Sequence, residues 1–437
     1  MKFLSKIFSP VFLFISIFLL LYTFYKSEFY WNGGIREYYY KYYLISFMLI
    51  IVSIVTFILN KKIKEYVIIS GVSLIFALYT LEVYFSFNPK LSNDRLLKEK
   101  IYQKKTGSKW DGRSRYEIYK DLKKLDDKIT ISLTPNNYLK ENYSIFPLSG
   151  ISDVKTINCN ENGFYSTYQS DRYGFNNQNH IWDSKEIEYL LIGDSFVHGF
   201  CVNRPNDIGS VLRTLSKKSV LNLGYGGIGP LMEYAILREY LSSNTKKVLW
   251  FYAEQNDLSN LEKETENKVL INYYNDQTFS QSLKSKQSDI NRLIRSVIDK
   301  EDKNDRFSKI IKLYFLRTII NLTKETEYTQ EPSPPIEFKK ILKMAKKLTD
   351  QNNADLYFIY IPEYNRYKNK LDNKNYILVK NIVKNLDIPF IDLHKEVFAK
   401  ESNPLKFFPF ELVGHYNIDG YEMIANHIFK TLDNLNK

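Results

Sequence analysis

Cysteine and histidine are scarce in this chain. Two cysteines, Cys159 and Cys201, and five histidines occur among 437 residues. No Cys-x-x-Cys pair and no cysteine–histidine cluster is present, so the sequence indicates neither a redox motif nor a structural zinc site. We therefore expect no metal and no organic cofactor.

Runs of charge of one sign are also lacking. The net charge of +12 comes mostly from lysines that are scattered along the chain. A basic balance can attract nucleic acid, lipid headgroups or an acidic glycan. No helix-turn-helix, zinc-finger or RNA-binding signature occurs, so we expect no nucleic-acid partner. A coding bias toward lysine and asparagine is the simpler explanation of the charge.

Long apolar runs, in contrast, open the chain. They cover residues 7–25, 42–60 and 66–87. Each is close to the roughly 20 residues that a helix needs to cross a bilayer. A cleavable signal peptide is the alternative for the first run, but no small-residue cleavage site follows it. We expect a membrane anchor of three transmembrane helices over residues 1–90.

Lysines near these runs predict the orientation of the anchor. Lys2 and Lys6 precede the first run, and Lys61, Lys62 and Lys64 occupy the second connection. Positively charged loops stay in the cytoplasm, and an odd number of spans then places the rest of the chain outside it. We expect a multi-pass protein of the inner (cytoplasmic) membrane, with the bilayer as a partner and the large domain on the periplasmic or extracytoplasmic side.

The remaining chain divides into two regions. Residues 91–185 are polar and weakly periodic, which favours a linker and irregular structure packed on the domain that follows. Apolar strand patterns then alternate with helical patterns: strands at 187–192, 219–223, 247–253, 356–361 and 388–393, and helices at 206–217, 230–241, 336–350, 375–385 and from 418. This alternation predicts an α/β domain with a parallel sheet over 186–437. A charged, mostly helical insertion at about 258–335 interrupts it and is expected to form a lid or a substrate wall.

Ligands bind beyond the carboxyl ends of parallel strands, and small polar motifs follow the first two strands. Gly193-Asp194-Ser195 follows the first strand and precedes a helix. A serine at such a turn exposes its hydroxyl near the positive end of the helix dipole. Glycines at 224, 226 and 227 follow the second strand, where the backbone can approach a ligand and donate an N–H. A phosphate-binding loop is excluded there because its lysine is missing.

Two further motifs complete the set. Asn256 and Asp257 follow the third strand, where an amide side chain can donate to an oxyanion. His415 lies in a loop directly before the last helix, from which it can reach back to a serine. His198 lies on the turn after Ser195 and is a poor general base.

In their order and at these strand ends, the four motifs resemble the SGNH/GDSL hydrolase superfamily. The serine, glycine, asparagine and histidine that name it map onto Ser195, Gly227, Asn256 and His415, with Gly224 or Gly226 as alternatives to Gly227. The stretch at 171–177, Asp-Arg-Tyr-Gly-Phe-Asn-Asn, is similar to a segment upstream of the serine in membrane-anchored members. The resemblance implies a flavodoxin-like three-layer α/β/α domain with a parallel sheet, the SGNH hydrolase fold.

The resemblance also implies acyl transfer. His415 would take the proton of Ser195, which would attack an ester carbonyl. The backbone N–H groups of Ser195 and Gly227 and the Asn256 amide would hold the oxyanion. Asp194 and Asp257 are expected to be structural residues beside this site.

One position departs from the family pattern. The acid is usually three residues before the histidine, where this chain has Leu412. Glu411 is the preferred substitute, Asp392 is a second candidate, and a Ser-His dyad without an acid is the third possibility. Cys159 precedes the 171–177 segment and Cys201 follows the serine turn, so outside the cytoplasm they could form a disulfide beside the site.

Three functions remain open at this point. The first is a membrane-anchored serine esterase or deacetylase acting on an acylated glycan or lipid. The second is an O-acyltransferase that modifies a cell-surface polysaccharide, for which a membrane acyltransferase partner would be needed. The third is a non-catalytic glycan-binding module on the same fold, a hypothesis motivated by the missing acid at position 412.

Overall fold

The chain folds into two compact units in a computed structural model. The structure describes residues 2–30, 36–87, 93–139, 141, 143–320, 322, 332–370 and 373–435. Unit 1 comprises residues 1–91 and 304–329, and unit 2 comprises residues 92–303 and 330–437. The boundaries after residues 303 and 329 both fall inside 258–335, the region expected to be a single insertion.

Three helices in unit 1 are long and apolar enough to cross a membrane. They are α1 (Lys2–Phe24), which continues as a short π-helix over Tyr25–Tyr30, α2 (Arg36–Ile58) and α3 (Lys61–Phe87). Asn60 lies in the tight connection between α2 and α3, where its side chain accepts the Ile63 N–H. Length and composition therefore support a membrane-anchored chain.

Burial in these helices is the reverse of that in a water-soluble domain. Small polar side chains such as Ser16, Ser53 and Thr56 are buried, and the Ser9 hydroxyl donates to the carbonyl of Thr56 across α1 and α2. Large apolar side chains point outward instead; Phe76 is 75% exposed. Small residues at the interface of packed helices and apolar residues on the outside are typical of a bundle in lipid.

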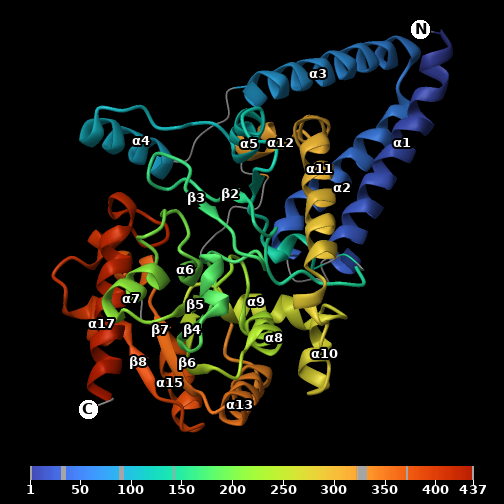
Figure 1. Cartoon of the computed structure of the whole chain (residues 1–437). Coiled ribbons are helices and arrows are strands. Elements are labelled where there is room, and N and C mark those ends of the chain that lie inside the picture. Colours follow the sequence, from blue (N-terminus) through green and yellow to red (C-terminus); the bar gives the residue numbers. More distant parts are fainter. Residues whose placement is uncertain are drawn as a thin grey trace. The chain divides into compact units, whose positions relative to one another are not determined.

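Unit 2 is built on a five-stranded parallel sheet in the order β5-β4-β6-β7-β8 (Figure 1). The strands are β4 (Ile187–Ile192), β5 (Val220–Asn222), β6 (Thr245–Ala253), β7 (Asp355–Ile361) and β8 (Phe390–Asp392). Within each long strand, alternate residues enter two different hydrophobic cores: Val248 and Trp250 face one, whereas Leu249 and Phe251 face the other. Both faces of the sheet are therefore covered.

Helices cover both faces of this sheet (Figure 1). Residues of α8 and α13 belong to one core, and residues of α7 and α17 belong to the other. The helices of this unit after β4 are α6 (Ser195–His198), α7 (Ile208–Ser216), α8 (Pro230–Tyr240), α9 (Asp257–Thr265), α10 (Leu270–Asn275), the first part of α11 (Gln287–Ile311), α13 (Ile336–Gln351), α14 (Tyr364–Lys368), α15 (Lys374–Lys384), α16 (Leu393–Glu396) and α17 (Ile418–Leu435).

The region at 91–185 is more ordered than a linker. It contains α4 (Asn93–Thr106), α5 (Arg115–Lys123) and a small sheet of β1 (Thr130–Ile131), β2 (Lys155–Ile157) and β3 (Thr167–Gln169). Leu133, Phe146 and Ile157 are buried in the same core as β4 and β6. This region is therefore part of the domain that carries the sheet. Its strands have only two or three residues, too few to give a recognisable alternation of apolar and polar positions.

The insertion expected at 258–335 is divided between the units. Its first part, with α9, α10 and the buried Ile290 and Ile294 of α11, packs in unit 2. Residues 304–329, with the end of α11 and with α12 (Tyr314–Ile319), belong to unit 1. The insertion is therefore not one compact piece among the described residues, and its role as a lid or substrate wall stays a prediction.

Candidate active site

Ser195 is the first residue of the short helix α6, directly after β4. The Asp194 side chain caps this helix by accepting the Phe196 N–H at 2.9 Å. Ser195 is 7% exposed. The backbone N–H of a first-turn residue has no partner inside its own helix, so that of Ser195 remains available to a ligand.

His415 lies against this serine from the loop before α17. Its Nε2 is 2.9 Å from the Ser195 Oγ, and its Nδ1 is 3.0 Å from the Glu161 Oε1. The backbone N–H of His415 donates to the other oxygen of the same carboxylate at 2.7 Å. An ionised carboxylate only accepts, so Nδ1 carries the proton and Nε2 is free to accept the serine hydroxyl. These three side chains form one continuous chain of hydrogen bonds.

The acid beside the histidine is Glu161, which corrects the expectation for Glu411. Phe410 and Glu411 both adopt left-handed backbone conformations, with φ of 57° and 58°. Glu411 is exposed, and its carbonyl accepts from the Tyr364 hydroxyl. Two carboxylate contacts from Glu161 hold the histidine instead.

Asp392, the second candidate for the acid, is engaged elsewhere. Its carboxylate accepts from the Tyr376 hydroxyl, from the Lys380 ammonium at 2.7 Å and from the Lys395 N–H at 3.1 Å. These bonds cap α16 and anchor α15, so Asp392 supports the fold. The geometry also differs from a Ser-His dyad without an acid, because His415 has a carboxylate partner.

The loop that carries Glu161 is held in several ways. Cys159 and Cys201 form a disulfide that joins this loop to the chain just after α6. The Asn162 side-chain amide donates to the Cys201 carbonyl at 3.0 Å, and the Asn160 side chain accepts the Gly163 N–H at 2.9 Å. The glutamate is thereby fixed two residues from a covalent link to the segment that bears the serine.

Lys98 of α4 supports the same group from another side. Its ammonium donates to the Val413 carbonyl at 2.6 Å, two residues before the histidine. Burial lowers the pKa of Lys98, and the charge of Glu161 opposes that change. A helix from the region expected to be a linker therefore holds the histidine loop.

Electrostatics within the triad favour a charged acid and a basic histidine. Burial would lower the pKa of His415, but the charge and the hydrogen bond of Glu161, together with the charge of Asp194, raise that pKa above its usual value. Burial opposes ionisation of Glu161, yet the charge and the hydrogen bonds of His415 lower the pKa of that carboxyl. Each partner thus stabilises the charged form of the other.

The other histidines have different surroundings. His198 is fully buried among the rings of Tyr168, Phe200 and Tyr225, and burial lowers its pKa to about 3. It is therefore neutral, and aromatic side chains rather than the serine hydroxyl surround its ring. His394 pairs with the Tyr367 hydroxyl.

The three glycines of the loop after β5, which are candidates for an oxyanion donor, have different surroundings. The Gly224 N–H donates to the Asn222 side chain at 2.9 Å, so it is not available as an oxyanion donor. Gly227 has a φ of +75°, and a Cβ there would approach the Thr134 side chain to 2.9 Å. At Gly226 a Cβ would collide with the ring of Phe200, which lies 5.2 Å from the His415 ring. Gly226 therefore lies near the histidine, on the other side of the Phe200 ring, and Gly227 lies next to Thr134.

The turn after β6 lies beside Asp194. Burial raises the pKa of the Asp194 carboxyl, and the Asn256 side chain is among the groups that oppose this change. Asp257 begins α9, and its carboxylate accepts the Ala253 N–H at 2.8 Å, which fixes this turn. The structure thus brings the segment with Asn256 to the capping residue of the nucleophile helix.

The Asp-Arg-Tyr-Gly-Phe-Asn-Asn segment at 171–177 is hydrogen-bonded to the ends of β5 and α6. The buried Asp171 carboxylate accepts the Asn177 and Trp182 side-chain N–H groups. Asn177 in turn donates to the carbonyl of Asn222 at the end of β5, and Asn176 donates to that of His198 at the end of α6. The segment therefore fixes the serine turn relative to the glycine loop.

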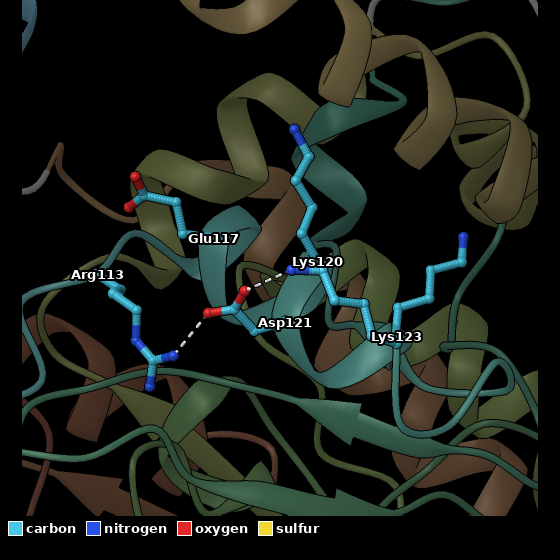
Figure 2. Close-up of a pocket in the computed structure, with 6 residues that line it drawn as sticks. Arg113, Glu117, Lys120, Asp121 and Lys123 are labelled. Atoms are coloured by element: carbon cyan, nitrogen blue, oxygen red, sulfur yellow. Dashed lines mark hydrogen bonds and ion pairs between the residues drawn. The ribbon is translucent and has the colours of Figure 1, made fainter.

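Two other features of unit 2 are less suited to this chemistry. Glu161, Cys201 and His415 have donor atoms within 4.8 Å of one another, but a disulfide sulfur is a poor ligand compared with a thiolate. A surface hollow on α5 has only charged side chains around it, and Figure 2 shows Arg113 and Asp121 turned toward each other there. Its lining holds no serine, cysteine or histidine: Arg113, Glu117, Lys120, Asp121, Lys123 and Lys124.

Glu161 is the site residue that sequence reasoning missed. The family pattern places the acid beside the histidine, whereas Glu161 precedes the serine in the chain. The signal that could have identified it is the turn Asn160–Gly163 next to Cys159, since a disulfide to Cys201 would bring that turn to the serine.

Comparisons with known proteins add a distant likeness. No family model matches the chain, and no curated protein matches it. A solved structure from Desulfitobacterium hafniense DCB-2, assigned to a lipolytic protein of the G-D-S-L family, is similar over 56% of this chain and 99% of that chain, with 13% identity and a TM-score of 0.33. A likeness of this size does not identify an activity, so the function has to follow from the site.

Proposed function

We propose that this chain is a membrane-anchored serine esterase or deacetylase of the SGNH type. The observation that carries the proposal is the unbroken chain from the Ser195 Oγ through His415 to Glu161, with contacts of 2.9 and 3.0 Å. A serine, a base and an orienting acid at hydrogen-bond distance are the requirements for nucleophilic acyl transfer.

The reaction follows from the proton positions. Glu161 holds the Nδ1 proton of His415, so Nε2 takes the hydroxyl proton as the Ser195 Oγ attacks the ester carbonyl carbon. The imidazolium then protonates the leaving alcohol as its bond to that carbon breaks, which leaves an acyl-serine. Water attacks the acyl-serine with His415 again as base, releasing the carboxylic acid and the free serine.

The oxyanion would be held by three donors. We assign them to the N–H groups of Ser195 and Gly227 and to the side-chain amide of Asn256, with Gly226 as the alternative to Gly227. The use of the Gly224 N–H within its own loop supports this choice. Loss of one such donor costs about 2.7–4 kcal/mol of transition-state stabilisation.

The fold is consistent with this chemistry. In chain order the strands lie 2-1-3-4-5, which is the flavodoxin-like order, and ligands of such sheets bind beyond the strand carboxyl ends. Ser195, the glycine loop and Asn256 follow the three neighbouring strands β4, β5 and β6. Helices on both faces support the three-layer SGNH arrangement.

The disulfide supports a location outside the cytoplasm. Structural disulfides persist in oxidising compartments and are rare in the cytosol. Cys159 and Cys201 both lie in unit 2, so their pairing agrees with the orientation that the lysines around the three spans predict. We infer an inner-membrane protein whose catalytic domain faces the periplasmic or extracytoplasmic side.

We infer the substrate class from the anchor. An acylated glycan or lipid near the membrane surface would be within reach of an anchored esterase. The same acyl-serine could pass its acyl group to a sugar hydroxyl in place of water, with a membrane partner as the source of the acyl group. The contact between Glu161 and His415 supports a catalytic domain over a non-catalytic module, which was motivated by the missing acid at position 412.

The test uses the full chain purified in detergent. We expect hydrolysis of a short-chain aryl ester and labelling by a serine-reactive phosphonate, and we expect both to vanish in Ser195→Ala. Ser285→Ala, at an exposed serine, is the matched control and should keep full activity. Equal turnover in Ser195→Ala and the parent would refute the proposal. Addition of a glycan acceptor during turnover then separates transfer from hydrolysis.

A further inference from the structure

The final part of the insertion forms a helical hairpin within unit 1. Helix α11 ends at Ile311, Leu313 turns the chain with a φ of 48°, and α12 follows over Tyr314–Ile319. Although α11 has 25 residues, neither it nor α12 is among the described helices that are apolar enough to cross a membrane. The hairpin nevertheless packs on α3, one of the helices that is.

The N-terminal end of α12 is satisfied by a transmembrane helix. The first N–H groups of a helix have no partner inside it and normally bind water or a capping side chain. Here the N–H groups of Phe315 and Leu316 donate to the carboxylate of Glu82 on α3, at 3.0 and 2.8 Å. Glu82 is completely buried. A carboxylate from the apolar helix α3 thus serves as the cap.

The free carbonyls of the hairpin are satisfied in the same way. The Tyr79 hydroxyl of α3 donates to the carbonyl of Ile311 at 3.1 Å. The Tyr38 and Tyr42 hydroxyls of α2 both donate to the carbonyl of Leu322. Side chains of two membrane helices therefore take positions that water would occupy around a hairpin in solution.

Large apolar side chains are exposed on the hairpin, together with Lys312. Phe307, Ile311 and Ile320 are 72%, 52% and 58% exposed. Exposed apolar side chains, including Phe76 and Tyr84, also lie on α3, the helix against which α12 packs. In a bilayer the protein itself must satisfy its backbone groups, as α2 and α3 do for the hairpin. Exposed apolar side chains can then face lipid.

We infer that the hairpin of residues 307–320 is embedded in the lipid bilayer beside α2 and α3. It adds a membrane contact to those of the three long apolar helices. The Lys309 ammonium lies over the ring of Tyr314, 5.6 Å from its centroid, so it has a partner within the hairpin. Lipid acyl chains are the occupant of its apolar face. The inference stands on the anchor and does not depend on the esterase activity.

Site-directed fluorescence on the full chain tests this inference. Phe307→Cys, Ile311→Cys and Ile320→Cys each add one thiol to a protein whose described cysteines are paired. Each variant is labelled with an environment-sensitive dye and reconstituted in vesicles of phosphatidylcholine and phosphatidylglycerol. We expect quenching by nitroxide-bearing acyl chains and protection from aqueous iodide, as for Phe76→Cys on α3.

Leu125→Cys is the matched control in unit 2, where the side chain is 84% exposed. It should be quenched by iodide and not by the nitroxide lipids. Iodide quenching of the hairpin labels equal to that of Leu125→Cys would overturn the inference. Protection from both quenchers would overturn it as well, since a second copy of the chain or another membrane protein would then cover the face.

The cap provides an independent test of how the hairpin is held. Glu82→Gln leaves one oxygen in place of the two that accept from Phe315 and Leu316, so iodide should reach a label at Ile320 several-fold faster while a label at Phe76 is unaffected. Glu37→Gln, at an exposed acid on α2, is the control and should leave both labels unchanged. No increase in Glu82→Gln would contradict the assigned role of Glu82.

Discussion

Glu161 and His415 form the contact on which the chemistry depends most. The carboxylate binds both the Nδ1 and the backbone N–H of the histidine, so it fixes the ring as well as its tautomer. An acid in this position also stabilises the imidazolium that forms as the serine is deprotonated. The ring and the main chain of one residue are thus held by a single side chain from a distant loop.

Replacement of this acid should therefore be severe. In Glu161→Gln we expect kcat for an aryl ester to fall roughly 10⁴-fold, because an amide can favour the wrong tautomer and cannot stabilise the imidazolium. Glu411→Gln, at the acid first suggested by the sequence, should retain parental kcat and KM. Steady-state kinetics measures both. A large loss in Glu411→Gln with a small one in Glu161→Gln would reverse the assignment.

The pH dependence follows from the same pair. Burial acts against protonation of His415, but Glu161 raises its pKa above the usual value of 6.5. The general base must be neutral, so activity should fall as the pH drops through this raised pKa. In Glu161→Gln the acid limb of kcat/KM should move to lower pH, which a pH–rate profile of the two proteins measures. An acid limb that stays in place would contradict coupling between the two groups.

The site was only partly accessible to sequence reasoning, for a physical reason. Ser195, Asn256 and His415 stand at element boundaries, where strand and helix patterns in the sequence indicate which side chains face the sheet edge. Glu161 sits in a loop with no such pattern, and only a tertiary contact relates it to the histidine. Lys98 was missed likewise, because a lysine on a polar helix resembles any solvated residue.

At the scale of elements, the disulfide loop is the part that assembles the site. The Cys159–Cys201 bond closes a segment with a sequence separation of 42 that contains Glu161, Ser195 and the Asp171 segment. Asn162 adds a hydrogen bond to the carbonyl of Cys201 itself. The loop with the acid and the turn after the nucleophile helix therefore move as one piece.

Removal of this bond should affect catalysis as well as stability. In Cys159→Ser we expect a loss of about 2–4 kcal/mol in unfolding free energy. We also expect kcat to fall while KM changes little, because Glu161 is no longer held at the histidine. Thermal unfolding and kinetics at a temperature where the variant stays folded measure the two effects. Cys201→Ser should match it, and a parental kcat in both folded variants would show that the bond only stabilises the fold.

The parallel sheet was the element most open to prediction. Strands expected at 187–192, 247–253 and 356–361 are observed at Ile187–Ile192, Thr245–Ala253 and Asp355–Ile361. Buried parallel strands are continuous apolar runs, which stand out between charged helices. The short elements of 91–185 have no comparable run. They are stabilised by burial against the sheet, which becomes visible only when the chain is folded.

At the scale of the molecule, the chain passes between its two units more than once. It leaves unit 1 after residue 91, returns at 304 and leaves again after 329. Sequence reasoning placed the first boundary near residue 90 but assigned 304–329 to the large domain. The charged residues of α11 conceal the hairpin, since its partners are polar side chains on α2 and α3, the buried Glu82 among them.

A soluble fragment beginning at residue 92 should therefore behave poorly. Without α2 and α3, the apolar hairpin would face water, and we expect the 92–437 fragment to self-associate in detergent-free buffer. Phe307→Ser, Ile311→Ser and Ile320→Ser together should make it largely monomeric by light scattering, with esterase activity retained. The matched control is a triple serine variant at Leu125, Ile336 and Ile377, exposed apolar residues of unit 2, and it should leave the self-association unchanged. Equal improvement in both variants would remove the special role of the hairpin.

The disulfide beside Glu161 also sets the order of events during biosynthesis. The anchor is synthesised first, and the acid, the serine and the histidine follow in that order along the chain. With the proposed location outside the cytoplasm, the thiols stay reduced until export, and protein that has not been exported lacks the bond that holds Glu161 at His415. The proposed esterase activity would then rise on oxidation. Protein still inside the cell would act slowly on acylated compounds, and full turnover would follow export.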